Sequence, residues 1–160
     1  MRSSVVVACL AFGACSNPSP VGGLCDLGAQ PDPDEVMITT GVRDCASRTC
    51  LRVTETNPNP PAGAMEPTGT DGLCTATCAS DDDCAGVQGS PCVTGFACAI
   101  PPGLTAGPMC CTKLCVCRDY VAPDVAEPDA CDATNAANAC CNLSGRTGNP
   151  QYPACTAGPT

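Results

Sequence analysis

The sequence contains no histidine and no tryptophan, and its aromatic residues are two Phe and two Tyr. Without an imidazole, Ser-His and Cys-His nucleophilic pairs and His-metal catalysis are excluded. The chain also lacks any Cys-x-x-Cys motif, the usual site of a thiol oxidoreductase. The sequence therefore predicts a protein that is not an enzyme and carries no cofactor.

Large aliphatic side chains are scarce as well. Leu, Ile, Val and Phe together account for 24 of the 160 residues, below the level of roughly one fifth that marks an ordinary globular chain. Burial of so few apolar groups does not offset the conformational entropy that folding costs. With 16 Gly and 17 Pro, the backbone is also rich in turn residues. Something other than a hydrophobic core must hold this chain together.

The chain is rich in cysteine, with 18 residues. This density is typical of exported domains that are stabilised by disulfides. A metal-thiolate protein is the alternative, but zinc ligands usually come in pairs two to four residues apart. Here the closest pair beyond the two vicinal ones is Cys115 and Cys117. We therefore predict no metal site and a small disulfide-rich fold, mostly irregular with short β-strands and little or no helix outside the leader.

The net charge is −9, and only Arg43, Arg48 and Arg52 lie near one another among the seven basic residues. A nucleic-acid backbone would be repelled by such a chain. We expect no nucleic-acid partner.

The N-terminus has the features of an export signal over residues 1–14. One positive charge, Arg2, precedes an apolar run that is too short to span a bilayer. The segment AFGAC, which ends at Cys15, resembles the lipobox of bacterial lipoproteins, in which the cysteine is acylated after cleavage. Lipidation at Cys9, or cleavage as an ordinary secretory signal, are the alternatives.

The number of cysteines agrees with lipidation at Cys15. Loss of Cys9 with the leader and acylation of Cys15 would leave sixteen thiols, an even number. The resemblance implies that Ser16 would direct the lipoprotein to the outer membrane. The predicted disulfide framework is Cys25, Cys45, Cys50, Cys74, Cys78, Cys84, Cys92, Cys98, Cys110, Cys111, Cys115, Cys117, Cys131, Cys140, Cys141 and Cys155.

Pro/Gly-rich stretches divide the mature chain. We expect the cysteine-bearing regions on either side of them to be separate bodies. The predicted segments are a flexible tether at 15–33, a small strand-containing module at 34–56, a Pro/Gly linker at 57–72, a cysteine-rich core module at 73–120 and a cysteine-containing tail at 121–160.

Residues 35–56 are the most strand-like part, because apolar and polar residues alternate there. Their pattern predicts a hairpin with Cys45 and Cys50 in its turn, crosslinked by these two cysteines or by Cys25.

The core module contains the vicinal pair Cys110-Cys111. Neighbouring cysteines rarely bond each other, because a trans dipeptide does not easily supply the geometry of a disulfide. We expect each to reach a different partner, which would make the pair the point that holds the module together.

Several motifs resemble a group of cysteine-rich lipoproteins of myxobacteria and their relatives. They are VRDCASRTCLRV, SDDDC, GFAC and GPMCCTKLCVCRDY. That family brings no known activity.

A weaker resemblance concerns Cys78-x5-Cys84 together with Cys110-Cys111-x3-Cys115, which is similar to the whey-acidic-protein four-disulfide core. It implies a protease inhibitor. A loop held between two disulfides, such as Ala99–Leu104, would suit inhibition because its bound conformation is fixed in advance. Asp81, Asp82 and Asp83 also suggest calcium, although they lack the ligand spacing of an EF-hand.

These patterns together predict an exported protein anchored in a membrane by lipid, with about eight disulfides and a structural or binding role toward an extracellular protein or glycan. The predicted location is extracytoplasmic, as an outer-membrane lipoprotein or otherwise as a secreted protein. A protease inhibitor and a metal-thiolate protein are the alternative functions.

Substitution of Cys15→Ala should abolish incorporation of radioactive palmitate, because the acylated sulfur would be gone. Labelling of the unaltered chain and of a Cys9→Ala chain serves as the control. Undiminished labelling of the Cys15→Ala protein would remove this assignment.

Overall fold

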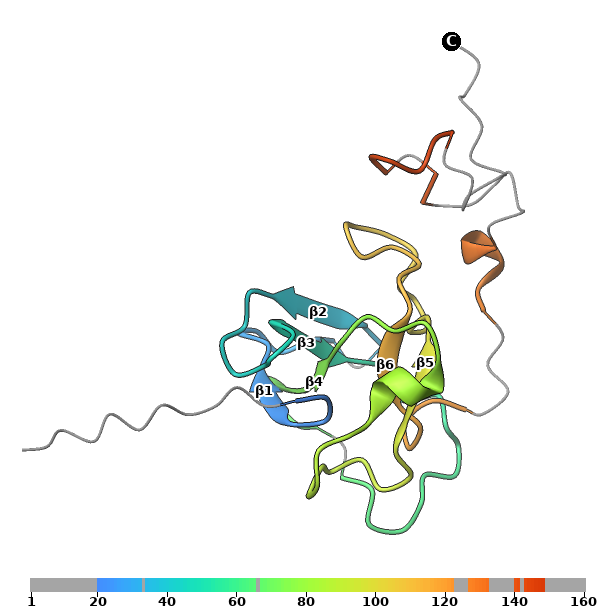
Figure 1. Ribbon diagram of the computed structural model, residues 1–160. Helices are drawn as coiled ribbons and strands as arrows, with labels where there is room; N and C mark the ends of the chain where they lie inside the picture. The colour runs from blue at the N-terminus through green and yellow to red at the C-terminus, as the bar shows by residue number, and fades with distance from the viewer. Residues whose placement is uncertain are drawn as a thin grey trace, which may run out of the picture.

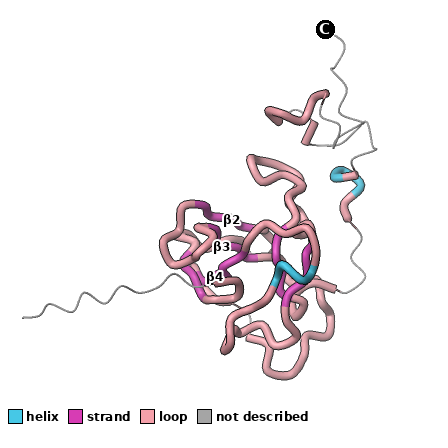
Figure 2. The backbone as a smooth tube through the Cα atoms, in the orientation of Figure 1, coloured by secondary structure: helices cyan, strands magenta, loops and turns pink. Residues whose placement is uncertain are grey.

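The computed structural model describes residues 20–32, 34–65, 67–122, 127–132, 140–141 and 143–148. Loops and turns make up most of these ranges, and the regular elements are short (Figure 2). This confirms the predicted fold class. The leader and Cys15 lie outside the described residues. The elements are β1 (Leu24–Asp26), β2 (Met37–Thr40), β3 (Thr49–Arg52), β4 (Asp71–Thr75), β5 (Phe96–Ala99), β6 (Leu114–Cys117) and the 3-10 turns η1 (Asp81–Cys84) and η2 (Asp129–Cys131).

The strands form two antiparallel sheets that lie next to each other (Figure 1). The first has the order β1-β4-β3-β2, and the second consists of β5 and β6. An isolated bridge between Thr77 and Leu114 connects the end of the first sheet to β6. The Thr75 hydroxyl also donates a hydrogen bond to the carbonyl of Cys115 at 2.8 Å. The two sheets are thus joined through β4 and β6.

This arrangement differs from the predicted segments. Strand β1 lies within the predicted tether 15–33, and β4 runs from the predicted linker 57–72 into the core module 73–120. Both strands belong to the same sheet as the hairpin of the 34–56 module, so the modules are not separate bodies. Asp71 and Gly72 begin β4, and neither residue type favours strands, which hid this strand in the sequence.

The predicted linker is also hydrogen-bonded to the core. Just before the linker, the Thr56 amide donates to the Tyr120 carbonyl at 2.8 Å. Within it, the Asn57 side-chain amide donates to the Asp119 carbonyl at 3.0 Å. Farther along, the Tyr120 hydroxyl donates to the Met65 carbonyl at 2.5 Å. Residues 56–65 are therefore held against the core at both ends of the segment.

The predicted hairpin is present as β2 and β3, which pair from Met37↔Arg52 to Thr40↔Thr49. Cys45 lies in the turn between them, as expected, whereas Cys50 lies in β3 and not in the turn. Successive side chains of a strand point to opposite faces of the sheet, and the Cys50 side chain lies on a face of β3 where it is fully buried.

Seven disulfides form among the described residues, from fourteen of the sixteen cysteines predicted to pair. Cys141 is disulfide-bonded as well, and Cys155 lies outside the described residues. The pairs are Cys25–Cys50, Cys45–Cys74, Cys78–Cys98, Cys84–Cys115, Cys92–Cys117, Cys110–Cys140 and Cys111–Cys131.

The vicinal cysteines reach two different partners, as their geometry predicted, but they are not the point that holds the core module together. Both partners, Cys131 and Cys140, belong to the tail. The core module is crosslinked instead through β5 and β6, where Cys98, Cys115 and Cys117 bond to cysteines in η1 and the loops that precede β5. The vicinal pair therefore attaches the tail to the core.

The bridge Cys25–Cys50 passes over Gly72. Cys25 pairs with Gly72 across β1 and β4, yet Cys50 lies on β3, the strand beyond. The two Cα atoms are 6.0 Å apart, whereas two strand spacings in a flat sheet would be about 9.6 Å. A Cβ atom on residue 72 would lie 2.8 Å from the Cys50 sulfur. The sheet can bend over itself here only because residue 72 has no side chain.

Sulfur makes up much of the interior. One buried cluster contains Leu27 together with four half-cystines, and a second surrounds Phe96, Leu73 and Tyr120 with four more. A third cluster is aliphatic and packs Leu51 and Leu114 against neighbouring side chains. Half-cystines thus occupy positions that larger apolar residues fill in ordinary cores.

Asp119 is the one charged side chain among the fully buried described residues. Its carboxylate accepts hydrogen bonds from the backbone amides of Val93 and Thr94, at 2.5 and 2.9 Å, and from the Thr94 hydroxyl. Ionised carboxylates are tolerated in a protein interior when donors surround them in this way. Asp119 therefore fixes the loop that leads into β5.

Substitution of Asp119→Ala should lower the free energy of unfolding by about 2 kcal/mol, because two backbone amides and the Thr94 hydroxyl would lose the buried carboxylate that accepts their hydrogen bonds. Guanidinium titration of the oxidised protein measures this loss. The control is Asp82→Ala, at an exposed position, which should change stability by less than about 0.5 kcal/mol. Equal effects of the two substitutions would contradict the role given to Asp119.

Candidate functional site

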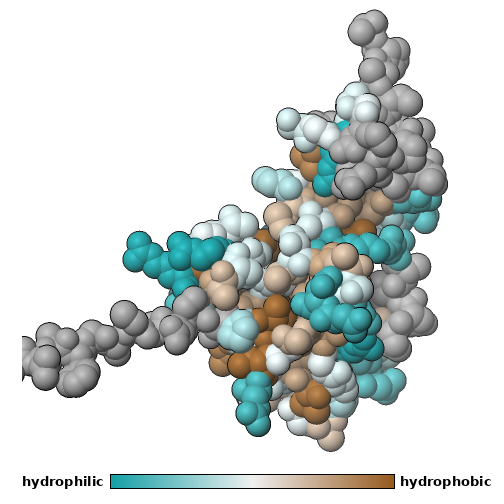
Figure 3. Space-filling view, in the orientation of Figure 1, coloured by the Kyte–Doolittle hydropathy of each residue, from teal (hydrophilic) through white to brown (hydrophobic). Residues whose placement is uncertain are grey.

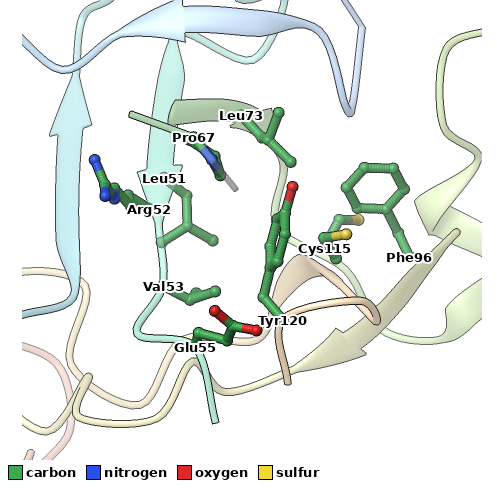
Figure 4. Close-up of a pocket in the computed structure, with 10 residues that line it drawn as sticks. Leu51, Arg52, Val53, Glu55, Pro67, Leu73, Phe96, Cys115 and Tyr120 are labelled. Atoms are coloured by element: carbon green, nitrogen blue, oxygen red, sulfur yellow. The ribbon is translucent and has the colours of Figure 1, made fainter. Parts of the chain in front are cut away.

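A small cavity lies between the two sheets, lined by Tyr120, Phe96 and Leu73 among others (Figure 4). Its volume is about 20 Å³, which is about the room that a single water molecule needs. The Tyr120 hydroxyl is already bonded to a backbone carbonyl. This cavity is a packing gap in the core and is too small to bind a substrate.

A larger hollow, here called the β2 groove, lies between β2, the edge strand of the first sheet, and the loop 104–109, and has a volume of about 380 Å³. Val36, Ile38 and Thr40 form one wall, because alternate residues of an extended segment point to the same side. The other wall is the loop 104–109, drawn in yellow-orange between β5 and β6 in Figure 1. Its volume is in the range of binding sites for small ligands and peptides.

The loop wall is closed by hydrogen bonds of its own. The Cys111 amide donates to the Leu104 carbonyl at 2.9 Å, and the Cys110 amide donates to the Gly107 carbonyl at 3.1 Å. Gly107 has a φ of 70°, which glycine adopts at little cost. Since Cys110 and Cys111 are both in disulfides, this wall is fixed at its base by two covalent crosslinks.

The strand wall is fixed too. The Thr39 hydroxyl donates to the Leu27 carbonyl at 2.9 Å on the face opposite the groove, and Met37 packs there against the cluster of half-cystines. Val36 and Ile38 pack on the groove side against the aliphatic cluster. The two walls are therefore held in place without a ligand.

The charges near the groove are segregated. None of the described lining residues is charged, but Asp32, Asp34 and Glu35 are exposed where the chain enters β2. At the other end, the hairpin turn carries Arg43, Asp44 and Arg48, all exposed. The groove thus has an acidic end and an end of mixed charge.

The rest of the visible surface mixes hydrophilic and hydrophobic patches and shows no single apolar area (Figure 3). A second hollow of about 370 Å³ lies between the core and the tail, where Lys113 and Glu127 form an ion pair at 2.5 Å. A third, of about 260 Å³, lies beside Ala97 and Val116. The β2 groove runs along the edge strand of the four-stranded sheet and has no charged residue in its described lining, whereas the hollow beside Ala97 is also lined by Asp81 and Arg118.

Two of the three aspartates that suggested calcium, Asp81 and Asp83, are hydrogen-bonded within the protein. Asp81 accepts from the Cys98 amide at 2.7 Å and pairs with Arg118 at 2.5 Å. Hydrogen bonds from the Ala79 and Ser80 amides hold the pKa of Asp83 below its ordinary value of 3.8. These carboxylates order the turn before β5, so a cation would have to displace protein donors.

The loop Ala99–Leu104 does not have the form that an inhibitory segment needs. Ile100, Pro101 and Leu104 are buried in the aliphatic cluster and its surroundings. An inhibitory loop presents side chains that enter the active site of the protease, and here these side chains support the fold. The apolar side chains of this segment therefore contribute to the core.

Some half-cystine sulfurs gather in threes, as in Cys25, Cys45 and Cys74, whose sulfur atoms lie within 4.8 Å of one another. All three are in disulfides. A metal binds the thiolate form of cysteine, so these clusters have the geometry of crosslinks and not of an open ligand set.

No helix among the described residues is long and apolar enough to cross a membrane. The chain matches no protein family, no curated protein and no solved structure.

Sequence reasoning did not find the groove. The loop 104–109 is Pro/Gly-rich and reads as an ordinary surface loop, while Val36 and Ile38 read as core. The vicinal cysteines were the available signal, because two crosslinks on adjacent residues imply that the neighbouring backbone is held in one position.

Addition of millimolar calcium should leave the thermal unfolding midpoint unchanged, because Asp81 and Asp83 already accept hydrogen bonds from protein donors. Magnesium at the same ionic strength is the control. A calcium-specific rise in the midpoint that an Asp82→Asn substitution removes would show that a site forms at this turn.

Proposed function

We propose that this protein is an exported binding module, anchored through Cys15, that holds a protein partner in the β2 groove. The observation that carries this function is the groove itself, an apolar hollow whose loop wall is fixed by two crosslinks and whose strand wall is held by a hydrogen bond and by packing. A rigid site loses little conformational entropy on binding, and that raises the affinity that a given contact area can reach.

The disulfides indicate the compartment. Seven crosslinks among the described residues require an oxidising environment, such as the periplasm or the cell exterior. This agrees with export. Lipid attachment at Cys15 and an outer-membrane location are the finer parts of the proposal, and the resemblance of AFGAC to a lipobox supports them.

The anchor would hold the module close to the membrane. The fold begins near residue 20, where the Val87 amide donates to the Val21 carbonyl and the Gly22 amide donates to the Cys74 carbonyl, both at 2.8 Å. Four residues lie between Cys15 and Pro20, and the five residue steps span at most about 17 Å. The tether is therefore much shorter than the predicted 15–33.

A protein partner is favoured over a glycan. The groove is lined by aliphatic side chains and lies on a sheet edge, and this combination is typical of sites that bind an extended or apolar polypeptide segment.

Site-specific photo-crosslinking tests the site in cells that produce the protein. A photoreactive residue in place of Ala106, exposed on the loop wall, should give a discrete crosslinked protein product. The matched control carries the same residue in place of Ala62, an exposed alanine in another loop. Equal products from both positions, or none from position 106, would contradict binding in the groove.

A further inference from the structure

We propose that the occupant of the β2 groove is an extended, positively charged peptide segment that adds to β2 as a fifth strand of the first sheet. This rests on the proposed function, since it names the chemistry of the partner that the groove would hold.

Strand β2 has an open edge. It is the last strand in the order β1-β4-β3-β2, and its described pairing is with β3 alone. In an antiparallel sheet, every second residue of an edge strand directs its N–H and C=O away from the sheet. An extended peptide can take up these groups as an additional strand.

The groove lies where the side chains of an added strand would go. Val36 and Ile38 face the loop wall, whereas Met37 and Thr39 face Leu27 and the opposite side. An added strand would direct alternate side chains to these same two sides. One set would enter the apolar space of about 380 Å³ beside Leu104 and Met109. The backbone would supply affinity, and the groove would select small or medium apolar side chains.

The other sheet edges are less suited to this role. The outer side of β5 is occupied, because the Cys98 amide donates to the Asp81 carboxylate at 2.7 Å. Strand β1 has three residues, and its Asp26 lies directly opposite Asp71. Edge strands that are short and charged resist pairing with another chain. The open edge with an apolar hollow beside it is β2.

Charge determines the kind of peptide. Asp32, Asp34 and Glu35 are exposed at the start of β2, and the whole chain has a net charge of −9. Such a field attracts cationic segments and repels a second copy of this chain. Because the far end carries Arg43 and Arg48, the lysine or arginine residues of the peptide would lie at the start of β2.

Selection from a displayed library of random twelve-residue peptides, against the oxidised full chain, supplies the probes. We expect the retained peptides to alternate apolar residues, to lack proline in that part, and to carry Lys or Arg near one end. Their binding should slow amide hydrogen exchange in β2, and it should weaken as salt rises because the end charges are screened.

Backbone methylation tests strand addition directly. N-methyl groups on one set of alternate residues of a retained peptide should reduce affinity at least tenfold, and methyl groups on the other set should have little effect. This difference follows because only one set donates to β2. Equal effects of the two sets would overturn strand addition.

Asp34→Lys should weaken binding about threefold to fivefold at low salt, as removal of a favourable charge at the rim of a site does. The matched control is Asp82→Lys, which changes the net charge equally at an exposed position in η1 and should alter affinity less than twofold. Equal weakening by both would overturn the local charge preference.

The remaining outcomes separate this inference from the proposed function. One outcome is that the Ala106→Glu protein binds the peptides more weakly, although the peptides do not slow amide hydrogen exchange in β2. That result would overturn strand addition and keep the groove as a binding site. A stable dimer through β2 in sedimentation would show that a second copy is the occupant. Failure both to retain any peptide and to crosslink at position 106 would overturn both proposals.

Discussion

Covalent crosslinking is the constraint on which this structure depends. Each disulfide contributes roughly 2–4 kcal/mol by restricting the unfolded chain, whereas the buried aliphatic side chains are few. The bridges also act locally, since each of the two sheets is joined to loops or strands by its own half-cystines. Loops that would otherwise be mobile can therefore serve as fixed walls, and the groove beside β2 is the clearest case.

Hydrogen bonds hold segments of the chain that contain few cysteines. Asp119 and Tyr120 follow the last crosslinked residue of β6, and they hold two segments that contain few cysteines, the loop before β5 and residues 56–65. A buried carboxylate is expensive to desolvate, so its partners must stay in place. Two consecutive residues just after β6, Asp119 and Tyr120, thus order parts of the chain that lie far apart in sequence.

The sequence predicted what depends on local chemistry. Cysteine density and the low apolar content indicated a disulfide-rich, mostly irregular fold, and the geometry of a dipeptide indicated that Cys110 and Cys111 would bond elsewhere. It did not predict β4 or the groove. Residue 72 must be glycine because the Cys50 sulfur atom occupies the space that a side chain would take. Ile38 and Leu104 belong to the same cluster only in the folded chain. Such contacts between distant residues leave no local pattern.

The overlap of two bridges has a consequence for survival outside the cell. Cys25–Cys50 and Cys45–Cys74 close rings that share residues 45–50. A protease that cuts the exposed, Pro-rich stretch near Asn59 would leave the two pieces joined through Cys45–Cys74. A cut between Cys25 and Cys45 would likewise leave the ends joined through Cys25–Cys50. A molecule nicked once in either place remains a single covalent unit, and it keeps its strands in register while other proteins around it are degraded.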